Sequence, residues 1–329
     1  MKGKYTITVH DNLVSYSLEL ERKITVIKGE SGIGKSHMYS LLTDLAKRGK
    51  NSGVKCNMTS SIVVLSVTSW EKAIADHDKI IFADEMDIPF HDRDFQEAIT
   101  HSNNYFVLIT RSAHLYDIGY AISSIYTLTT EKSSGVDHHT KLCELYAHKS
   151  KTVPLASTVI TEDSKSGYIM MCDIVGEDIH VVSAGGKDNV YNYIKKLYSD
   201  RANPLCIFVD GAAFGARFSQ VLAYSKTHSG VFQVLAPESF EWLLLQTSVF
   251  NKKLNNELTE TWEYCDTTKF STWEQYYTSL ITELLRGTKY PYTKEKLSPL
   301  FRTAKVQNNI KSLLNESKIF IVIKDGEIQ

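Results

Sequence analysis

The stretch GESGIGKS, residues 29–36, is the feature that most limits what this chain can fold into. Its three glycines let the backbone turn closely around a small group, in conformations with positive φ that other residues avoid. The apolar residues 24–29 predict a short strand, and residues 37–49 have helical spacing and end on Gly49. A glycine-rich loop between a strand and a helix exposes backbone N–H groups, which favour a bound anion.

This loop also matches the pattern G-x-x-x-x-G-K-[ST]. In that pattern Lys35 reaches the β- and γ-phosphates of a nucleotide, and Ser36 is a ligand of Mg²⁺. The alternative is a glycine-rich turn that carries an incidental lysine. The candidate nucleotide-binding residues of the loop are Gly29, Glu30, Ser31, Gly32, Ile33, Gly34, Lys35 and Ser36.

Composition excludes several classes of protein. With 43% apolar residues and a formal charge of −1, the chain can bury a sizeable core and has no overall basic excess that would favour nucleic acid. No apolar run reaches the roughly 18 residues of a membrane span, and the start lacks the apolar core of a signal peptide. The cysteines form no disulfide or zinc pattern, so a cytoplasmic protein is expected: Cys56, Cys143, Cys172, Cys206 and Cys265.

The first 150 residues alternate short strands with helices. This alternation is typical of a mainly parallel sheet with helices on both faces, so we predict an α/β domain over residues 1–150. The predicted strands are residues 6–9, 14–20, 24–29, 61–67, 79–85, 105–111 and 124–131, and the predicted helices are residues 37–49 and 68–76.

Polar residues follow two of these strands. Asp84 and Glu85 end the apolar run KIIFADE, where Asp84 is suited to a second Mg²⁺ contact and Glu85 to a general base that orients water. The alternative for this pair is a helix cap or a solvated turn. Thr110 and Arg111 lie just past the next strand, and only Thr110 is favoured by its position. Arg111 is equally suited to contacting a phosphate, in the same subunit or a neighbouring one, and to pairing with surface carboxylates.

On the motifs at residues 29–36 and 80–85, the chain resembles P-loop NTPases from residue 1 to about residue 130, and more closely the ATPase domains of the ABC and AAA type. The resemblance implies bound ATP, Mg²⁺ on Ser36 and Asp84, catalytic roles for Lys35 and Glu85, and a sensor role for Thr110. No LSGGQ-like signature is present, which departs from the ABC pattern, and the lack of an NKxD-like run favours ATP over GTP. Such ATPases often complete their site across a subunit interface, so a homo-oligomer is expected.

A second α/β region is predicted after the polar stretch at residues 148–156. We place it at residues 151–245, followed by a mainly helical C-terminal region at residues 246–329 packed on it. One strand ends in Glu162, a second is followed by Gly-Gly-Lys187, and a third runs into VDGAAFG, which begins at Val209.

These three strand ends resemble the TOPRIM fold, the metal-binding domain of topoisomerases, primases and OLD-family nucleases. Glu162 falls on the family's glutamate, and Asp210 and Gly215 fall on the first acid and the glycine of D-x-D-x-x-G. The resemblance implies that Glu162 and Asp210 bind Mg²⁺ or Mn²⁺ and act in phosphodiester chemistry. Ala212 replaces the second acid, so another carboxylate would have to fill in, from Asp163, Glu238 or Glu241. The alternative is that both acids only cap helices.

Two weaker features concern phosphate and nucleic acid. Lys187 is placed to contact a phosphate or simply to begin a solvated helix. The tract at residues 288–305 combines basic and aromatic side chains, as nucleic-acid grooves do, but also fits a solvated helical face.

Two functions follow. In the first, ATP binding and hydrolysis gate a metal-dependent nuclease or nucleic-acid-binding domain, an order of domains that resembles OLD-family nucleases and implies a role in defence against phage or mobile DNA. In the second, the chain is an ATP-dependent switch or assembly module whose non-catalytic TOPRIM-like domain binds a partner protein or a nucleotide. A small-molecule kinase is less favoured, because the chain has no arginine-rich lid. No membrane partner is expected.

Overall fold

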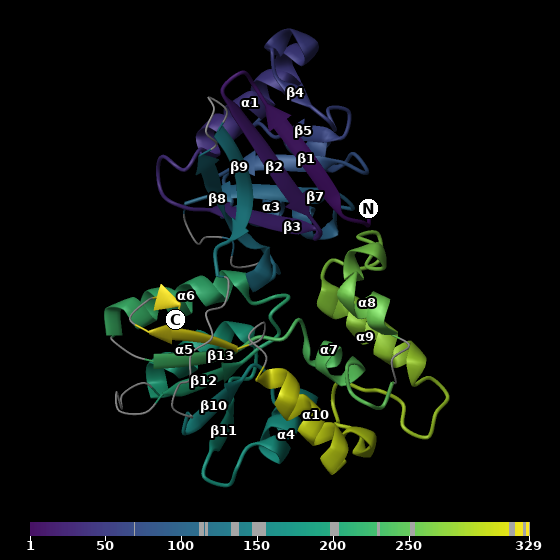
Figure 1. The fold of residues 1–329 in the computed structure, drawn as a ribbon. Coiled ribbons are helices and arrows are strands. Elements are labelled where there is room, and N and C mark those ends of the chain that lie inside the picture. Colours follow the sequence, from purple (N-terminus) through teal and green to yellow (C-terminus); the bar gives the residue numbers. More distant parts are fainter. Residues whose placement is uncertain are drawn as a thin grey trace. The chain divides into compact units, whose positions relative to one another are not determined.

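The computed structural model describes residues 1–68, 70–111, 115, 118–132, 138–146, 156–197, 204–228, 231–250, 254–315, 320–324 and 327–328. The chain divides into two compact units (Figure 1). Unit 1 is Met1–Tyr146 with Glu260–Thr272, and unit 2 is Ala147–Thr259 with Trp273–Gln329. The predicted α/β class is confirmed, while the predicted boundary after residue 150 lies outside the described residues.

Unit 1 is built on a sheet with the order β4-β1-β2-β9-β8-β3-β7-β6-β5. It is mixed rather than mainly parallel, because β1 pairs antiparallel with both β2 and β4, and β8 pairs antiparallel with β9. Strands β2 and β9, far apart in the sequence, lie side by side (Figure 1). The strands are β1 Tyr5–His10, β2 Val14–Leu20, β3 Ile24–Lys28, β4 Lys55–Cys56, β5 Ile62–Val64, β6 Ile80–Asp84, β7 Tyr105–Thr110, β8 Ile125–Lys132 and β9 His138–Glu144.

Parallel pairing aligns the carboxyl ends of β3, β7 and β6. Lys28 of β3 pairs with Thr110 of β7, and Asp84 of β6 pairs with Ile109 of β7. These three strands are buried almost throughout, which explains their unbroken apolar runs. The loop after β3 therefore lies at the same sheet edge as the acids after β6.

Helix α1, Lys35–Arg48, buries an apolar stripe that fixes its direction. Met38, Leu42 and Leu45 of this stripe pack with residues of the β1–β2 pair and of the parallel strands in one core cluster. Burying side chains of this size contributes about 1.5–3 kcal/mol each. The other helical segments of unit 1 are η1 Gly49–Ser52, α2 Trp70–Ile74, α3 Arg93–His101, η2 Ile122–Ser124 and η4 Thr261–Glu263.

Unit 2 has a sheet with the order β11-β10-β12-β13-β14-β15. Its strands β10 to β13 pair parallel, and β14 and β15 add antiparallel pairs. Helix α5 packs against α6, and α4 packs against α10 (Figure 1). The strands are β10 Thr158–Thr161, β11 His180–Ser183, β12 Leu205–Phe208, β13 Val231–Leu235, β14 Phe320–Lys324 and β15 Glu327–Ile328. The helices are α4 Ser166–Ile174, α5 Lys187–Leu197, α6 Gly215–His228, α7 Phe240–Leu245, α8 Asn255–Thr259, α9 Trp273–Leu284, η5 Pro299–Phe301 and α10 Ala304–Leu314.

The order in which the chain adds strands to this sheet reverses at β10. It moves outward from β10 to β11 through α4, then returns past β10 to β12 through α5. In open α/β sheets a crevice forms at such a switch point, at the carboxyl ends of the two neighbouring strands. The residues that follow β10 and β12 are therefore the ones that topology places in a crevice.

Residues 260–272 depart from the predicted domains. The sequence analysis assigned residues 246–329 to one region packed on the second domain, whereas Glu260–Thr272 belongs to unit 1. This segment begins after α8 and ends where α9 starts. No periodicity in the sequence marks it, because its attachment rests on individual polar contacts.

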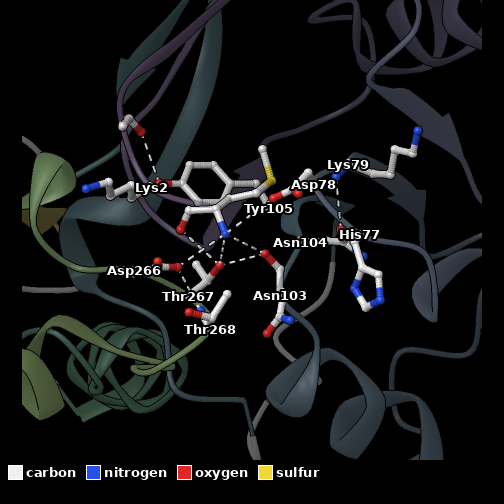
Figure 2. A network of polar contacts seen from close by, with 12 residues as sticks. Lys2, His77, Asp78, Lys79, Asn103, Asn104, Tyr105, Asp266, Thr267 and Thr268 are labelled. Atoms are coloured by element: carbon white, nitrogen blue, oxygen red, sulfur yellow. Dashed lines mark hydrogen bonds and ion pairs between the residues drawn. The ribbon is translucent and has the colours of Figure 1, made fainter.

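Thr267 is the centre of those contacts (Figure 2). Its hydroxyl accepts from the amino group of Met1 at 2.6 Å and donates to the carbonyl oxygen of Asn103 at 2.6 Å. Asp266 lies 3.5 Å from the same amino group, and the hydroxyl of Tyr105 donates to the carbonyl oxygen of Gly3 at 3.0 Å. Because Met1 is buried, these bonds replace those that its amino group would make with water.

Replacing Thr267 by valine should destabilise unit 1. The change keeps the shape but removes the hydroxyl, which leaves a buried ammonium and a carbonyl short of a partner, at a cost of about 1–3 kcal/mol. Thermal unfolding should show a lower Tm for Thr267→Val, while Thr59→Val, at an exposed hydroxyl of the same unit, serves as the control. Equal Tm values for the two variants would contradict the role given to Thr267.

None of the helices in the described part of the chain is long and apolar enough to cross a membrane. Buried thiols were expected from the sequence; Cys206 and Cys265 are buried, whereas Cys143 and Cys172 are exposed and Cys56 is half-buried.

Candidate functional site

The glycine-rich loop, Gly29–Ser36, leads from β3 into α1. Gly34 adopts φ 96° directly before Lys35, the first residue of the helix, a conformation that other residues rarely take. Gly29 has φ 155°, a conformation that residues with a side chain rarely adopt, and a Cβ there would stand 2.3 Å from Cδ1 of Ile33, which would have to shift. The hydroxyl of Tyr16, from β2, donates to the carbonyl oxygen of Gly34 at 3.2 Å and supports the loop from outside. The loop is therefore held in a tight turn.

A cavity of about 250 Å³ opens over this loop. The side chain of Lys35 is buried beneath it, where Nζ donates to the carbonyl oxygens of Gly29 and, at 2.9 Å, Glu30. Burial, and then the positive charge of Arg111, lowers the pKa of Lys35. The cavity is lined by Glu30, Ser31, Gly32, Gly34, Lys35, Ser36, His37 and Arg111. A nearby lysine, an arginine and the start of α1 give this cavity the donors that an anion needs, so the residues fit a nucleotide phosphate.

Not every predicted nucleotide-binding residue lines that cavity. Gly29 and Ile33 shape the turn, and Thr110 instead contacts Glu85. Arg111, which the sequence left between phosphate binding and a surface ion pair, lies at the cavity.

The acids after β6 have different environments. Asp84 is 9% exposed, and its Oδ1 accepts from the backbone N–H of Met86 at 2.9 Å, so it caps the turn after β6; it is neither a helix cap nor solvated. Burial raises the pKa of Asp84. The carboxylate of Glu85 instead reaches the end of β7, where it accepts from the hydroxyl of Thr110 at 2.5 Å and from the backbone N–H of Arg111 at 2.5 Å.

These contacts orient Glu85 relative to the loop. The charges of Asp84 and Glu85 both act on Lys35, so the acids lie within electrostatic reach of the cavity. An arrangement with one lysine, two carboxylates and an exposed helix start can bind a phosphate chain, share a divalent cation and hold a carboxylate near a reacting water. Glu85 is fixed by the neighbouring strand, which makes Thr110 a positioning residue for it.

A second cavity, of about 100 Å³, opens at the switch point of unit 2, and we call it the acidic pocket. Glu162 and Asp210, which follow β10 and β12, both line it. Oε2 of Glu162 accepts from the backbone N–H of Asp210 at 3.3 Å, and Oδ1 of Asp210 accepts from the N–H of Phe240 at 2.7 Å. The sequence thus identified two residues that lie 48 positions apart and that the fold brings together. Asp210 also forms a hydrogen bond with the first residue of α7.

Burial perturbs both carboxyl groups. It raises the pKa of Glu162 to about 7, with Glu274 adding to the effect. Burial also raises the pKa of Asp210 well above its usual range, and the charges of Glu274 and Glu162 raise it further. Two neighbouring acids that resist ionisation are a common feature of functional sites, although structural clusters show it as well.

Among the pocket residues that were given no individual role from the sequence are Glu274, Tyr292 and Lys294. Glu274 begins α9, and no local pattern connects it with β10. Tyr292 and Lys294 belong to the tract at residues 288–305, which the sequence analysis considered for nucleic acid or a solvated face. Tyr292 is 9% exposed and donates to Oε1 of Glu241 at 2.6 Å, so it is not solvated.

The three acids considered as substitutes for the carboxylate that Ala212 lacks do not all line the pocket. Ala212 is buried and does not line the pocket, whereas Glu241 and Asp163 do; Glu238 is outside the lining. Gly211 is needed at this turn, since a Cβ there would meet the carbonyl oxygens of Ala236 and Pro237 at 2.7 Å. Lys187 begins α5, and its charge acts on Glu162.

Among the residues that the structure describes, no three His, Cys, Asp or Glu side chains are arranged to hold one metal ion. No protein-family model, curated protein or solved structure matches this chain. The resemblances to P-loop NTPases and to TOPRIM domains therefore rest on the motifs and on the geometry above.

Replacing Thr110 by valine should release the carboxylate of Glu85 and so slow any ATP turnover at this site, without weakening nucleotide binding. A hydrogen bond to a charged partner contributes about 1.5–3 kcal/mol, so the loss should lower kcat about 10-fold to 100-fold if Thr110 holds Glu85 in position. Thr25→Val, at a buried threonine of the adjacent strand β3, is the control. Faster turnover in Thr110→Val would show that Thr110 restrains Glu85 in an inactive position instead.

Replacing Glu162 by glutamine should alter the pH dependence of stability. The protonated Glu162 stabilises the fold below its ordinary pKa of 4.5, and this contribution is lost as the pH rises through about 7. The Tm of Glu162→Gln relative to the wild type should therefore be higher at pH 8 than at pH 5. A pH-independent difference, such as that expected of the exposed Glu295→Gln, would contradict the assignment.

Proposed function

We propose that unit 1 is a P-loop ATPase. The observation that carries the proposal is the union, at one sheet edge, of a strained glycine-rich loop, the buried Lys35 and the oriented carboxylate of Glu85. The lack of an NKxD-like run favours ATP over GTP. In this assignment the phosphates lie in the cavity over the loop.

The roles of the residues follow from their positions. The backbone N–H groups of the loop hold the β- and γ-phosphates, and Lys35 exchanges its carbonyl partners for phosphate oxygens. Ser36 and Asp84 hold Mg²⁺, which supplies charge neutralisation on the phosphates when bound. Glu85 takes the proton of the attacking water, while Thr110 and the N–H of Arg111 keep its carboxylate in place.

For unit 2 we propose a TOPRIM-like domain whose state is gated by the nucleotide in unit 1. In this account Glu162 and Asp210 serve a nuclease that depends on Mg²⁺ or Mn²⁺, or bind nucleic acid, and the chain acts in defence against phage or mobile DNA. Support comes from the meeting of these two acids at the switch point of a parallel sheet.

A second function, an ATP-dependent switch with a non-catalytic TOPRIM-like domain that binds a partner protein or a nucleotide, is favoured by a different observation. The described carboxylates do not form a ready metal centre, and Ala212 is buried away from the pocket. In both accounts we propose that the chain forms a homo-oligomer. We also propose that it lies in the cytoplasm, a reducing compartment to which its free thiols are suited.

The ATPase assignment predicts that one variant loses binding of Mg-ATP and that another keeps this binding but loses hydrolysis. Lys35→Ala should weaken binding of Mg-ATP by about 10-fold to 100-fold, as expected for the loss of a charge-assisted contact. Glu85→Gln should bind Mg-ATP normally and hydrolyse it about 10²-fold to 10⁴-fold more slowly. Isothermal titration and phosphate release measure the two quantities, with the exposed Lys47→Ala of α1 as the control. Tight binding by Lys35→Ala would refute the assignment.

The two functions of unit 2 predict different outcomes in a cleavage assay. Labelled DNA and RNA are incubated with Mg²⁺ or Mn²⁺, with and without ATP, using the wild type and Glu162→Ala/Asp210→Ala. Metal-dependent cutting that the double variant loses is expected of the nuclease. Intact substrate alongside normal ATP turnover would reject the nuclease and favour the switch.

A further inference from the structure

The acidic pocket carries an imbalance of charge. Its lining includes Glu162, Asp163, Asp210, Glu241 and Glu274, and the one basic side chain among its lining residues is that of Lys294. Carboxylates gathered in so small a cavity repel each other, which is why the charge of Glu274 opposes ionisation of both Glu162 and Asp210. Part of this charge is balanced by Lys294, which lies against Glu241 and Glu274.

Glu241 has an oxygen without a partner in this cavity. Its side chain is 3% exposed, and Oε1 accepts from the hydroxyl of Tyr292, but the buried Oε2 has no hydrogen-bond partner. An unsatisfied buried carboxylate oxygen is costly, and native structures retain few of them. Glu241 lies near Asp210, because Phe240, the residue before it, donates its N–H to Asp210, and the charge of Glu241 acts on Asp210. A cation entering the pocket would satisfy this oxygen.

Lys294 occupies the place of such a cation. Its Nζ lies 2.8 Å from Oε1 of Glu274 and 3.6 Å from Oε1 of Glu241. The carboxylates of Glu241 and Glu274 thus hold the ammonium of Lys294 at the pocket by ion pairing. The side chain is 41% exposed, so the ammonium already reaches water and can swing out of the pocket into it.

We propose that the acidic pocket is a divalent-cation site whose third carboxylate, beside Glu162 and Asp210, is that of Glu241. Lys294 is the internal cation that the metal displaces. Carboxylate oxygens are the ligands that Mg²⁺ and Mn²⁺ prefer, and Glu241, from α7, supplies what Ala212 lacks. The acids do not now converge on one point, since Tyr292 and Lys294 engage Glu241. The structure therefore represents the lysine-neutralised state of the site.

This inference rests on the proposed function only in taking the pocket as the metal site of unit 2, and it requires neither cleavage nor ATP. The experiment is a titration of the nucleotide-free full chain with Mn²⁺, in which isothermal calorimetry measures the affinity for the metal. Every protein carries Asp84→Asn, so that the metal ligand proposed in unit 1 does not contribute.

Lys294→Met should bind one Mn²⁺ about 10-fold more tightly than the reference protein. Adding Glu241→Gln to Lys294→Met should weaken that binding by 10-fold or more. The control variants Lys296→Met and Glu295→Gln, at exposed neighbours in sequence, should match the reference. The Tm of each variant verifies that it is folded.

Three results would overturn the inference: no Mn²⁺ binding by either the reference or Lys294→Met, equal affinity of these two proteins, or no effect of Glu241→Gln. Binding by Lys294→Met alone supports it, because the lysine then excludes the metal. If Mn²⁺ binds as expected but no nucleic acid is cut, the metal site stands and the nuclease assignment fails, so the two failures are distinguishable.

Discussion

Parallel strand pairing determines where the polar residues of both candidate sites lie. In unit 1 it brings the ends of β3, β6 and β7 to one edge, so that a loop, an acid pair and a threonine from distant parts of the chain meet. In unit 2 the reversal at β10 opens a crevice between β10 and β12, where Glu162 and Asp210 meet. In both cases the strand core is apolar and the polar groups begin where the strand ends.

The two sites have opposite electrostatic character. The cavity over the glycine-rich loop has Lys35, Arg111 and the start of α1, and it is suited to an anion. The acidic pocket has an excess of carboxylates, and it is suited to a cation. A phosphate and a divalent cation are ligands whose charges are opposite to those of the two sites, and the proposed nucleotide and metal sites rest on this match.

Much of this arrangement could be predicted from the sequence, because the relevant signals are local. The loop, the strand ends at Asp84 and Glu162, and the turn at Asp210 each follow an apolar run that periodicity identifies. The placement of Glu274 and Lys294 could not be predicted, since they reach the pocket from the end of the chain through tertiary packing. Residues 260–272 were misassigned for a similar reason, because a few polar contacts, centred on Thr267 and the amino group of Met1, attach them to unit 1. The strand β9, which pairs antiparallel with β8, was missed because it is largely exposed and polar.

The central claim is that the glycine-rich loop binds the phosphates of ATP. A structure of the protein with a non-hydrolysable ATP analogue and Mg²⁺ would test it most directly. The account predicts that Nζ of Lys35 leaves the carbonyl oxygens of Gly29 and Glu30 and contacts the β- and γ-phosphates, with Ser36 and Asp84 near the metal. An analogue bound away from the loop, with Lys35 still on those carbonyl oxygens, would contradict it.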